Sequence, residues 1–182
     1  MKWFKMRELV EAVTSVVKGP YTHAFPAEPT ELPDWIRGKP VYDAEGCIGC
    51  GACATVCPVR AIEVSELRRE DGVPVRRFEL HYDNCVFCGD CVRRCSTQTG
   101  ITLSDQYELS GFDRSEMIES IDKELVPCEL CDESIAPRDQ LHWIYNRLGS
   151  MAYSNVTVFL TAQEALGLRD RVPRDDRPLD RT

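Results

Sequence analysis

Residues 47–57 read CIGCGACATVC, and residues 85–95 read CVFCGDCVRRC. Both stretches follow one pattern, Cys-x2-Cys-x2-Cys-x3-Cys, and together they hold all but two of the chain's 10 cysteines. Each cysteine of the second stretch lies 38 residues after its counterpart in the first, as Cys85 does after Cys47. The motif is therefore an internal repeat, and it decides the fold of the central part of the chain.

The spacing within each stretch is that of bacterial-type ferredoxins, which bind two [4Fe–4S] clusters through cysteine thiolates. Gly49, Gly51 and Gly89 lie between the cysteines and let the backbone wrap closely around a cluster. In this pattern the fourth cysteine ligates the other cluster. We therefore predict two [4Fe–4S] clusters, the first held by Cys47, Cys50, Cys53 and Cys95 and the second by Cys85, Cys88, Cys91 and Cys57.

Zinc sites and disulfide frameworks fit the cysteine pattern less well than iron–sulfur clusters do. Zinc sites usually pair two Cys-x2-Cys knuckles across a longer loop, and disulfide frameworks belong to small secreted chains. One position departs from the ferredoxin pattern, because Pro58 follows Cys57 as expected whereas Ser96 follows Cys95. Proline at this point helps to start a helix and is not a ligand, so we expect the change to do little harm.

The composition is that of an ordinary soluble protein and excludes several functions. Of 182 residues, 43% are hydrophobic and 29% are charged, and the formal net charge is −8. The negative charge argues against nucleic-acid binding, and no apolar run approaches the roughly 20 residues that span a bilayer. Glu8 and Glu11 interrupt what would be the apolar part of a secretory signal. We therefore expect the chain to reside in a reducing cytoplasm, where its thiols stay free.

Residues 1–40 are predicted to form an amphipathic helix followed by an extended arm. Apolar residues recur at three- and four-residue steps over residues 2–18, and Gly19-Pro20 ends the pattern. Such a helix could pack on the chain's own core, but Trp3-Phe4 flanked by lysine and arginine favours a membrane surface or a membrane subunit. Prolines recur along the rest of this region and predict the arm.

Residues 41–105 are predicted to be the ferredoxin-like domain. Four short strands are expected to flank the two cysteine stretches: residues 41–42, 62–64, 80–82 and 101–103. Residues 65–79 look like an insertion with an exposed turn near Asp71-Gly72 and a returning strand. Three arginines close to the cysteines are candidates for raising the cluster potentials, or are surface charges: Arg60, Arg93 and Arg94.

Residues 106–182 are predicted to be a helical extension with a charged tail, used for docking to other subunits. Asp113 is the expected N-cap of a helix over residues 113–125. A second helix is expected after Pro137, ending at Gly149.

The end of the extension is less strongly patterned. Residues 162–168 would form a short third helix, or a strand over residues 156–160 would precede it. Residues 169–182 are charged, and a partner would be needed to order them. The expected fold class is therefore α+β, with a bacterial-type 2[4Fe–4S] ferredoxin-like domain between a helical arm and a helical extension.

Cys128 and Cys131 form a single Cys-x2-Cys pair outside the repeat. As zinc ligands they would need about two further donors, and His142 is the only histidine downstream. A redox dithiol is disfavoured because acidic neighbours such as Glu129 oppose thiolate formation. We predict a reduced structural pair or the remains of a ligand site, with zinc binding as the alternative.

These motifs resemble those of a known family. Arg37-Gly38-Lys39, the first stretch through Cys53 and the second through Gly89 look like the two-cluster ferredoxin-like subunit of complex I. The same subunit type occurs in complex-I-related membrane-bound [NiFe] hydrogenases and formate hydrogenlyases. The pair Cys128-x2-Cys131, followed by Ile135-Ala136-Pro137, resembles the hydrogenase and hydrogenlyase branch more. The resemblance covers about residues 1–150.

The resemblance implies an electron-relay subunit with no catalytic residues of its own. Electrons from a ferredoxin- or formate-side donor would pass through two clusters toward a [NiFe] hydrogenase-type subunit. The implied partners are a small cluster-bearing subunit, a hydrogenase-like large subunit, a membrane subunit and ferredoxin, with the chain peripheral at the cytoplasmic face of the membrane. Alternatives are the equivalent complex I subunit, a sulfur-reducing relative, and a free ferredoxin, against which the arms argue.

Overall fold

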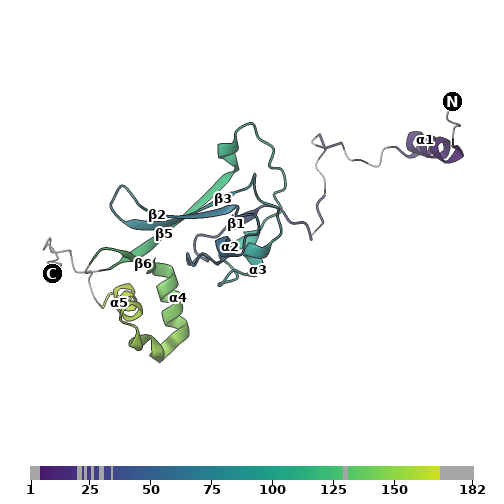
Figure 1. Cartoon of the computed structure of the whole chain (residues 1–182). Helices are drawn as coiled ribbons and strands as arrows, with labels where there is room; N and C mark the ends of the chain where they lie inside the picture. The colour runs from purple at the N-terminus through teal and green to yellow at the C-terminus, as the bar shows by residue number, and fades with distance from the viewer. Residues whose placement is uncertain are drawn as a thin grey trace. The chain divides into compact units, whose positions relative to one another are not determined.

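The structure is a computed structural model that describes residues 5–19, 22, 24–25, 27–28, 31–33, 35–128 and 131–168. The chain divides into two compact units, residues 1–36 and residues 37–182 (Figure 1). Within the described ranges, every helix is too short or too polar to cross a membrane. The predicted charged tail, residues 169–182, lies outside the described residues.

Helix α1 (Met6–Lys18) is the regular element described in the first unit, as the amphipathic pattern predicts. Six apolar side chains fall on one side of this helix: Met6, Leu9, Val10, Val13, Val16 and Val17. All six are exposed, from 46% for Leu9 to 85% for Val16. Gly19, with φ at +82°, ends the helix. The apolar side of α1 is therefore left uncovered by the described residues of its own unit.

The second unit is built on two antiparallel sheets, one small and one large. The small sheet pairs β1 (Pro40–Tyr42) with β4 (Ile101–Leu103). The large sheet has the strand order β2 (Ile62–Arg68), β3 (Pro74–His81), β5 (Ile118–Pro127) and β6 (Ser134–Pro137). Two one-turn helices lie within the cysteine stretches, α2 (Ala52–Thr55) and α3 (Asp90–Arg93).

The strands predicted beside the cysteine stretches are all present. The predicted insertion is the hairpin of β2 and β3, whose turn contains Gly72 at a φ of +82°. Cross-strand pairing places Ile62 opposite Leu80 and Val64 opposite Phe78. The hairpin is therefore continuous with the ferredoxin-like domain and carries part of its core.

The main core lies on the side of β3 that faces the cysteine stretches. Its buried residues are Ala61, Ile62, Phe78, Leu80 and Tyr82. Half-buried cysteines of both stretches pack against these residues. Since alternate residues of a strand share a face, β3 presents Phe78 and Leu80 together to the cysteines.

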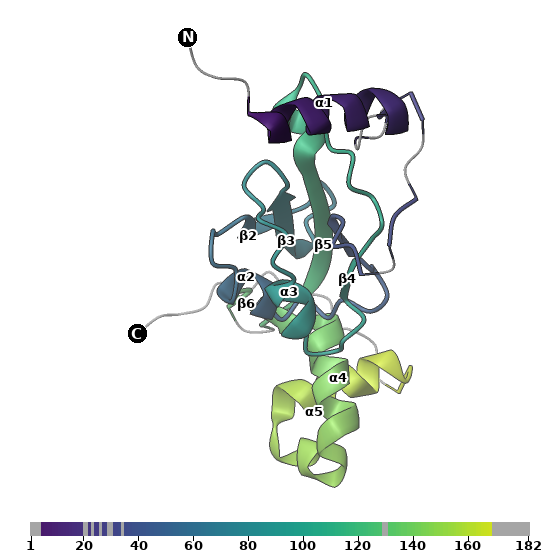
Figure 2. The same cartoon turned by 90° about the vertical axis from the view of Figure 1, so that its right-hand side faces the viewer.

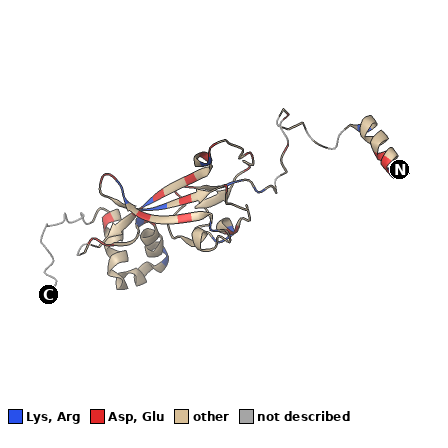
Figure 3. Cartoon of the chain, turned by 45° about the horizontal axis from the view of Figure 1, so that its top comes forward, with Lys and Arg blue, Asp and Glu red and all other residues tan. Residues whose placement is uncertain are grey.

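Charged residues of both signs lie along the strands of the large sheet (Figure 3). Arg76 pairs with Glu66 across β2 and β3, and Arg77 pairs with Asp122 across β3 and β5, each at 2.7 Å between nitrogen and oxygen. Opposite charges at directly facing positions stabilise one register over its neighbours. These pairs help to fix β3 between its two partner strands.

The helix predicted over residues 113–125 is wrong. One 3₁₀ turn, η1 (Arg114–Met117), begins after Asp113, whose side chain accepts a hydrogen bond from the Ser115 N–H at 2.9 Å. The chain then continues as β5, which pairs with β3 along residues 75–81. The apolar spacing fits a helix locally, but ladder hydrogen bonds and burial of Leu125 on the sheet outweigh local preference.

After β6 the chain forms α4 (Arg138–Leu148), η2 (Gly149–Ser154) and α5 (Val156–Ala165), with α4 and α5 side by side (Figure 2). Helix α4 begins after Pro137 and ends at Gly149, as predicted. The alternative strand over residues 156–160 is wrong, because Asn155 caps a helix there by accepting the Val158 N–H at 3.1 Å. A second core of Val126, Leu141, Ala152 and Val158 attaches these helices to β5.

Candidate metal centres

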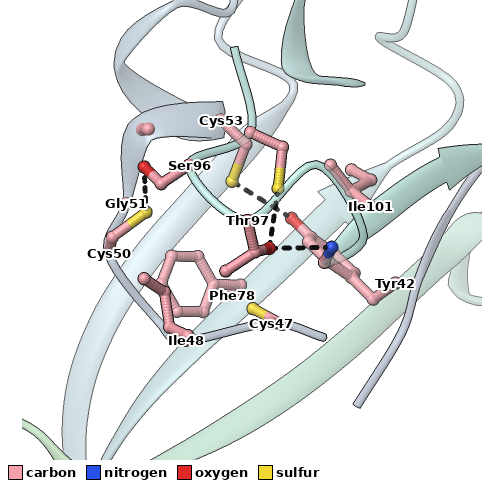
Figure 4. Close-up of a pocket in the computed structure, with 13 residues that line it drawn as sticks. Tyr42, Cys47, Ile48, Cys50, Gly51, Cys53, Phe78, Ser96, Thr97 and Ile101 are labelled. Atoms are coloured by element: carbon pink, nitrogen blue, oxygen red, sulfur yellow. Dashed lines mark hydrogen bonds between the residues drawn. The ribbon is translucent and has the colours of Figure 1, made fainter. Parts of the chain in front are cut away.

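A first cavity lies between the two cysteine stretches (Figure 4). Three cysteines of the first stretch and the last cysteine of the second line it: Cys47, Cys50, Cys53 and Cys95. Its remaining wall is largely apolar and includes Ile48, Phe78 and Ile101. The structure thus brings together the four side chains that the sequence pattern groups into the first cluster.

A second cavity repeats this arrangement with the stretches exchanged. The cysteines that line it are Cys85, Cys88, Cys91 and Cys57. Ile62, Leu80 and Leu103 supply apolar wall. Each cavity therefore combines the first three cysteines of one stretch with the fourth of the other.

The duplication extends from the sequence to the backbone. Positive φ angles recur at positions 38 residues apart: Gly49 (+71°) and Phe87 (+53°), Gly51 (+77°) and Gly89 (+74°), Arg60 (+54°) and Gln98 (+64°). A positive φ is uncommon for a bulky residue such as Phe87 and costs free energy. The tight winding of the loop requires it and turns N–H groups inward, so that the Phe87 N–H donates to Cys85 Sγ at 3.4 Å.

Hydrogen-bond donors and hydroxyl groups surround the sulfur atoms. The Ala61 N–H donates to Cys57 Sγ at 3.2 Å. Around the first cavity, three hydroxyl oxygens lie near three sulfurs: Tyr42 Oη 4.0 Å from Cys53, Ser96 Oγ 3.5 Å from Cys50, and Thr97 Oγ1 3.4 Å from Cys95. Groups of this kind orient thiolate ligands and tune a bound centre.

Sequence reasoning missed these hydroxyl groups. In the sequence, Ser96 stands out only as a departure from the expected proline, yet it reaches the sulfur of Cys50 in the other stretch. Thr97 also donates to the Gly46 carbonyl at 2.8 Å, which ties the two halves together beside the cavity. No local pattern reveals these two cross-stretch contacts, because Cys50 lies 46 positions from Ser96 and Gly46 lies 51 positions from Thr97.

Burial raises the pKa of four of these thiols and makes them poorer acids: Cys47, Cys53, Cys85 and Cys91. It raises the pKa of Cys53 and of Cys91 to about 11, with neighbouring cysteines adding to the effect. Cys95 differs, because hydrogen bonds from Thr97 and nearby backbone N–H groups outweigh its burial and lower its pKa. Buried thiols become thiolates most readily when they bind metal, so the donor set fits an iron–sulfur centre in each cavity.

The remaining candidate residues lie outside the cavities. Cys128 and Cys131 flank the turn between β5 and β6, where the Cys128 N–H donates to the Glu133 carbonyl at 2.8 Å. Neither lines a cavity described above. Across the described residues, no group of three or more histidine, cysteine or acidic side chains is placed so that it could hold one single metal ion. Three arginines considered for tuning are exposed: Arg60, Arg93 and Arg94.

Comparison with known proteins agrees with the geometry. Residues 46–99 match the family described as the 4Fe-4S dicluster domain. The chain is 39% identical to NADH-quinone oxidoreductase subunit I of Pelobacter propionicus over 39% of this chain and 40% of that protein. It is 34% identical to the subunit I of Protochlamydia amoebophila over 65% of this chain and 82% of that protein.

A further relative matches nearly the whole chain. Formate hydrogenlyase subunit 6 of Escherichia coli is 29% identical over 93% of this chain and 94% of that protein. The matched dicluster domain contains every cysteine that lines the two cavities. The chain therefore belongs to the iron–sulfur protein family of NADH-quinone oxidoreductase subunit I and formate hydrogenlyase subunit 6, and its ferredoxin-like domain binds two [4Fe–4S] clusters.

Proposed function

We propose that this chain is an electron-relay subunit of a membrane-bound oxidoreductase complex. In this proposal Cys47, Cys50, Cys53 and Cys95 ligate the first cluster, and Cys85, Cys88, Cys91 and Cys57 ligate the second. The observation that carries the proposal is the pair of cavities, each of which combines cysteines from both stretches. When bound, the clusters supply one-electron transfer.

The residues of the chain fix the distance between the two centres and exclude water from the space between them. Phe78 lines the first cavity and Leu80 the second, and both belong to the same buried core. Residues two apart on one strand are separated by roughly 7 Å. The cavities are therefore neighbours across packed apolar side chains, an arrangement that suits electron passage from one to the other.

The first unit supports attachment to a membrane or to a membrane subunit. The apolar side of α1 is exposed over its whole length, while Glu8, Glu11 and Lys18 belong to its other side. An exposed amphipathic helix of this kind binds at a membrane interface or in a partner's groove. We accordingly place the chain as a peripheral subunit on the cytoplasmic face of the membrane.

The hydrogenlyase type of complex is favoured over complex I. The similarity to formate hydrogenlyase subunit 6 runs over 93% of the chain, against 39% to 83% for the complex I subunits compared, and the pair Cys128-x2-Cys131 followed by Ile135-Ala136-Pro137 resembles the hydrogenlyase branch more. The partners would then be a small cluster-bearing subunit, a hydrogenase-like large subunit and a membrane subunit, with ferredoxin or a formate-side carrier as donor. The equivalent place in complex I or in a sulfur-reducing relative is the alternative.

Purification of the native complex through a tag on this chain tests the proposal. We expect membrane-derived partners, including a large subunit with nickel-binding Cys-x2-Cys pairs, and two [4Fe–4S]⁺ signals by electron paramagnetic resonance. A large subunit without those pairs would instead assign the complex to the quinone- or sulfur-linked alternative. Recovery of the chain as a soluble monomer that carries both clusters would contradict the relay-subunit proposal and indicate a free ferredoxin.

A further inference from the structure

Lys123, on β5, is buried beneath the first cysteine stretch. Only 7% of the residue is exposed, and among the described residues no other charged side chain is buried. Its ammonium group donates to the Ala44 carbonyl and, at 2.9 Å, to Asp139 Oδ2. Burying an ammonium group costs free energy unless the group is paired. The burial of Lys123 at this place in the fold therefore needs an explanation.

The lysine side chain lies against the backbone of the loop that begins the first cysteine stretch. Ala44 precedes Cys47 by three residues, and the Cys47 N–H donates to the Asp43 carbonyl at 2.9 Å. A Cβ atom placed on Gly49 would lie 3.1 Å from Lys123 Cβ. The ammonium of Lys123 thus contacts the chain before Cys47, at Ala44, and the start of its side chain lies beside Gly49, after Cys47.

The ion pair of Lys123 and Asp139 beside this loop is screened unequally by water. The carboxylate of Asp139 offsets the lysine only in part, because its side chain is 49% exposed and is therefore screened by water, whereas that of Lys123 is 9% exposed. The cation is therefore the less screened member of the ion pair beside the loop.

A second cation contacts the same loop and is also paired with a half-exposed carboxylate. Arg76 faces Lys123 across β3 and β5 and donates to the Gly49 carbonyl at 3.1 Å. Its guanidinium also makes two hydrogen bonds to Glu66 Oε1, at 2.7 and 3.1 Å. The Lys123 side chain is the more deeply buried of the two cations, 9% exposed against 21% for Arg76, so water screens its charge less.

The second cysteine stretch has a different environment. Its backbone is contacted by the exposed Arg37, whose Nη1 is 3.5 Å from the Cys88 carbonyl oxygen. The position that corresponds to Gly49 is Phe87, which cannot admit a lysine stem as closely as glycine does. The two otherwise repeated halves therefore differ in the charge placed beneath their cysteines.

We infer that Lys123 is a positioning residue that raises the reduction potential of the first cluster above the value its cysteine loop alone would set. The inference rests on the proposed ligand assignment. One-electron reduction takes the cluster from the 2+ to the 1+ level and adds negative charge, which a buried cation nearby stabilises. The extension thus acts on the electron path through β5 as well as serving for docking.

The test compares two substitutions that should shift the potential in opposite directions. Lys123→Met removes the positive charge at similar volume, and Asp139→Asn removes the partially compensating negative charge while keeping an oxygen for Lys123. Arg77→Met is the matched control, because Arg77 is an arginine on β3 that pairs with Asp122 and contacts neither cysteine stretch. Each variant is purified in its complex and titrated with dithionite under electron paramagnetic resonance.

The signal altered by Cys50→Ser identifies the first cluster. We expect Lys123→Met to make reduction of the first cluster at least about threefold less favourable. This corresponds to a reduction potential lower by about 28 mV, at 59 mV per tenfold change. Asp139→Asn should shift it the other way, and Arg77→Met should leave it unchanged. Absence of a shift in Asp139→Asn, or shifts of the same sign in both variants, would overturn the inference. If the Lys123→Met variant loses the first cluster, the direction of the potential shift in Asp139→Asn still tests the inference.

Failure of the proposed function would look different. It would show as fewer than two clusters in the unsubstituted complex, or as a first-cluster signal unaffected by Cys50→Ser. Two intact clusters with potentials indifferent to Lys123 and Asp139 would instead leave the relay function in place and reject only the role of Lys123.

Discussion

Phe78 and Leu80 lie two residues apart on the same face of β3, and each lines a different cysteine cavity. Both side chains are 1% exposed, and both belong to the same core. The strand therefore sets the separation of the two metal centres directly. Movement of either side chain would alter both the packing of the core and one specific cavity wall.

Truncation of these two residues should have separable effects on the clusters. Phe78→Ala should cost about 3–5 kcal/mol and Leu80→Ala about 2–5 kcal/mol of unfolding free energy, because each leaves a cavity in a closely packed core. Phe78→Ala should make the first cluster the more labile, and Leu80→Ala the second. Anaerobic denaturant titration and the decay of each paramagnetic signal measure the two effects. If both variants made both clusters equally labile, the assignment of Phe78 to the first cavity and Leu80 to the second would be contradicted.

Serine substitution of the fourth cysteine in each stretch tests the crossed arrangement. Cys57→Ser should remove the second cluster and leave the first, because the Cys57 side chain lines the second cavity. Iron content should fall from about eight to about four atoms per chain, given four iron atoms per cluster. Cys95→Ser should give the opposite result.

Spectra of Cys50→Ser and Cys88→Ser show which signal belongs to which cavity. If Cys57→Ser abolished the signal that Cys50→Ser also abolishes, each stretch would hold its own cluster and the crossed assignment would be wrong.

The ferredoxin-like part of the fold was predictable because its information is local and repeated. The cysteine spacing marks each loop, and the apolar residues beside it mark short strands that the structure contains, such as β1 and β4. The extension was not predictable in the same way. The apolar spacing over residues 117–125 fits a helix, and only pairing with β3 decides for a strand. The place of Lys123 was not predictable either, because its acceptor, Ala44, is 79 positions distant.

Gly49 and Gly72 provide a matched pair for testing the contact between the first cysteine loop and the extension. Both have a positive φ, +71° and +82°, so alanine at either position costs about 1–2 kcal/mol of backbone strain. A Cβ atom at Gly49 would also lie 3.0 Å from Pro137 and 3.1 Å from Lys123 Cβ, whereas one at Gly72, in the turn between β2 and β3, would meet nothing within 4 Å. Gly49→Ala should therefore destabilise the first cluster more than Gly72→Ala.

Thermal loss of the visible absorption of the clusters measures this difference. The two variants should share the strain, and the excess for Gly49→Ala reports the contact with Pro137 and Lys123. Identical melting of the two variants would show that the extension does not constrain the loop.

Removal of both clusters should unfold the two cores to different extents. The main core packs directly against cysteines such as Cys53 and Cys85, so loss of the metal centres removes its support. The second core, which includes Leu141 and Val158, contains no cysteine. After chelation under reducing conditions, amide hydrogen exchange should accelerate in β1 and β4 but remain slow in α4. Uniform acceleration across the chain would show that the extension has no stability of its own.

The apolar side of α1 should govern binding to membranes. Val16 and Ser15 are neighbours on opposite sides of the helix, with Val16 85% exposed on the apolar side. Val16→Asp places a charge where the helix would enter the interface and forfeits about 1.5–3 kcal/mol of apolar burial, equivalent to a partition weaker by roughly 10- to 150-fold. Ser15→Asp adds the same charge on the polar side and should change binding by less than about twofold. Flotation of the cluster-loaded chain with phosphatidylglycerol-containing vesicles measures the bound fraction, and equal losses in the two variants would show that the apolar side of α1 does not contact lipid.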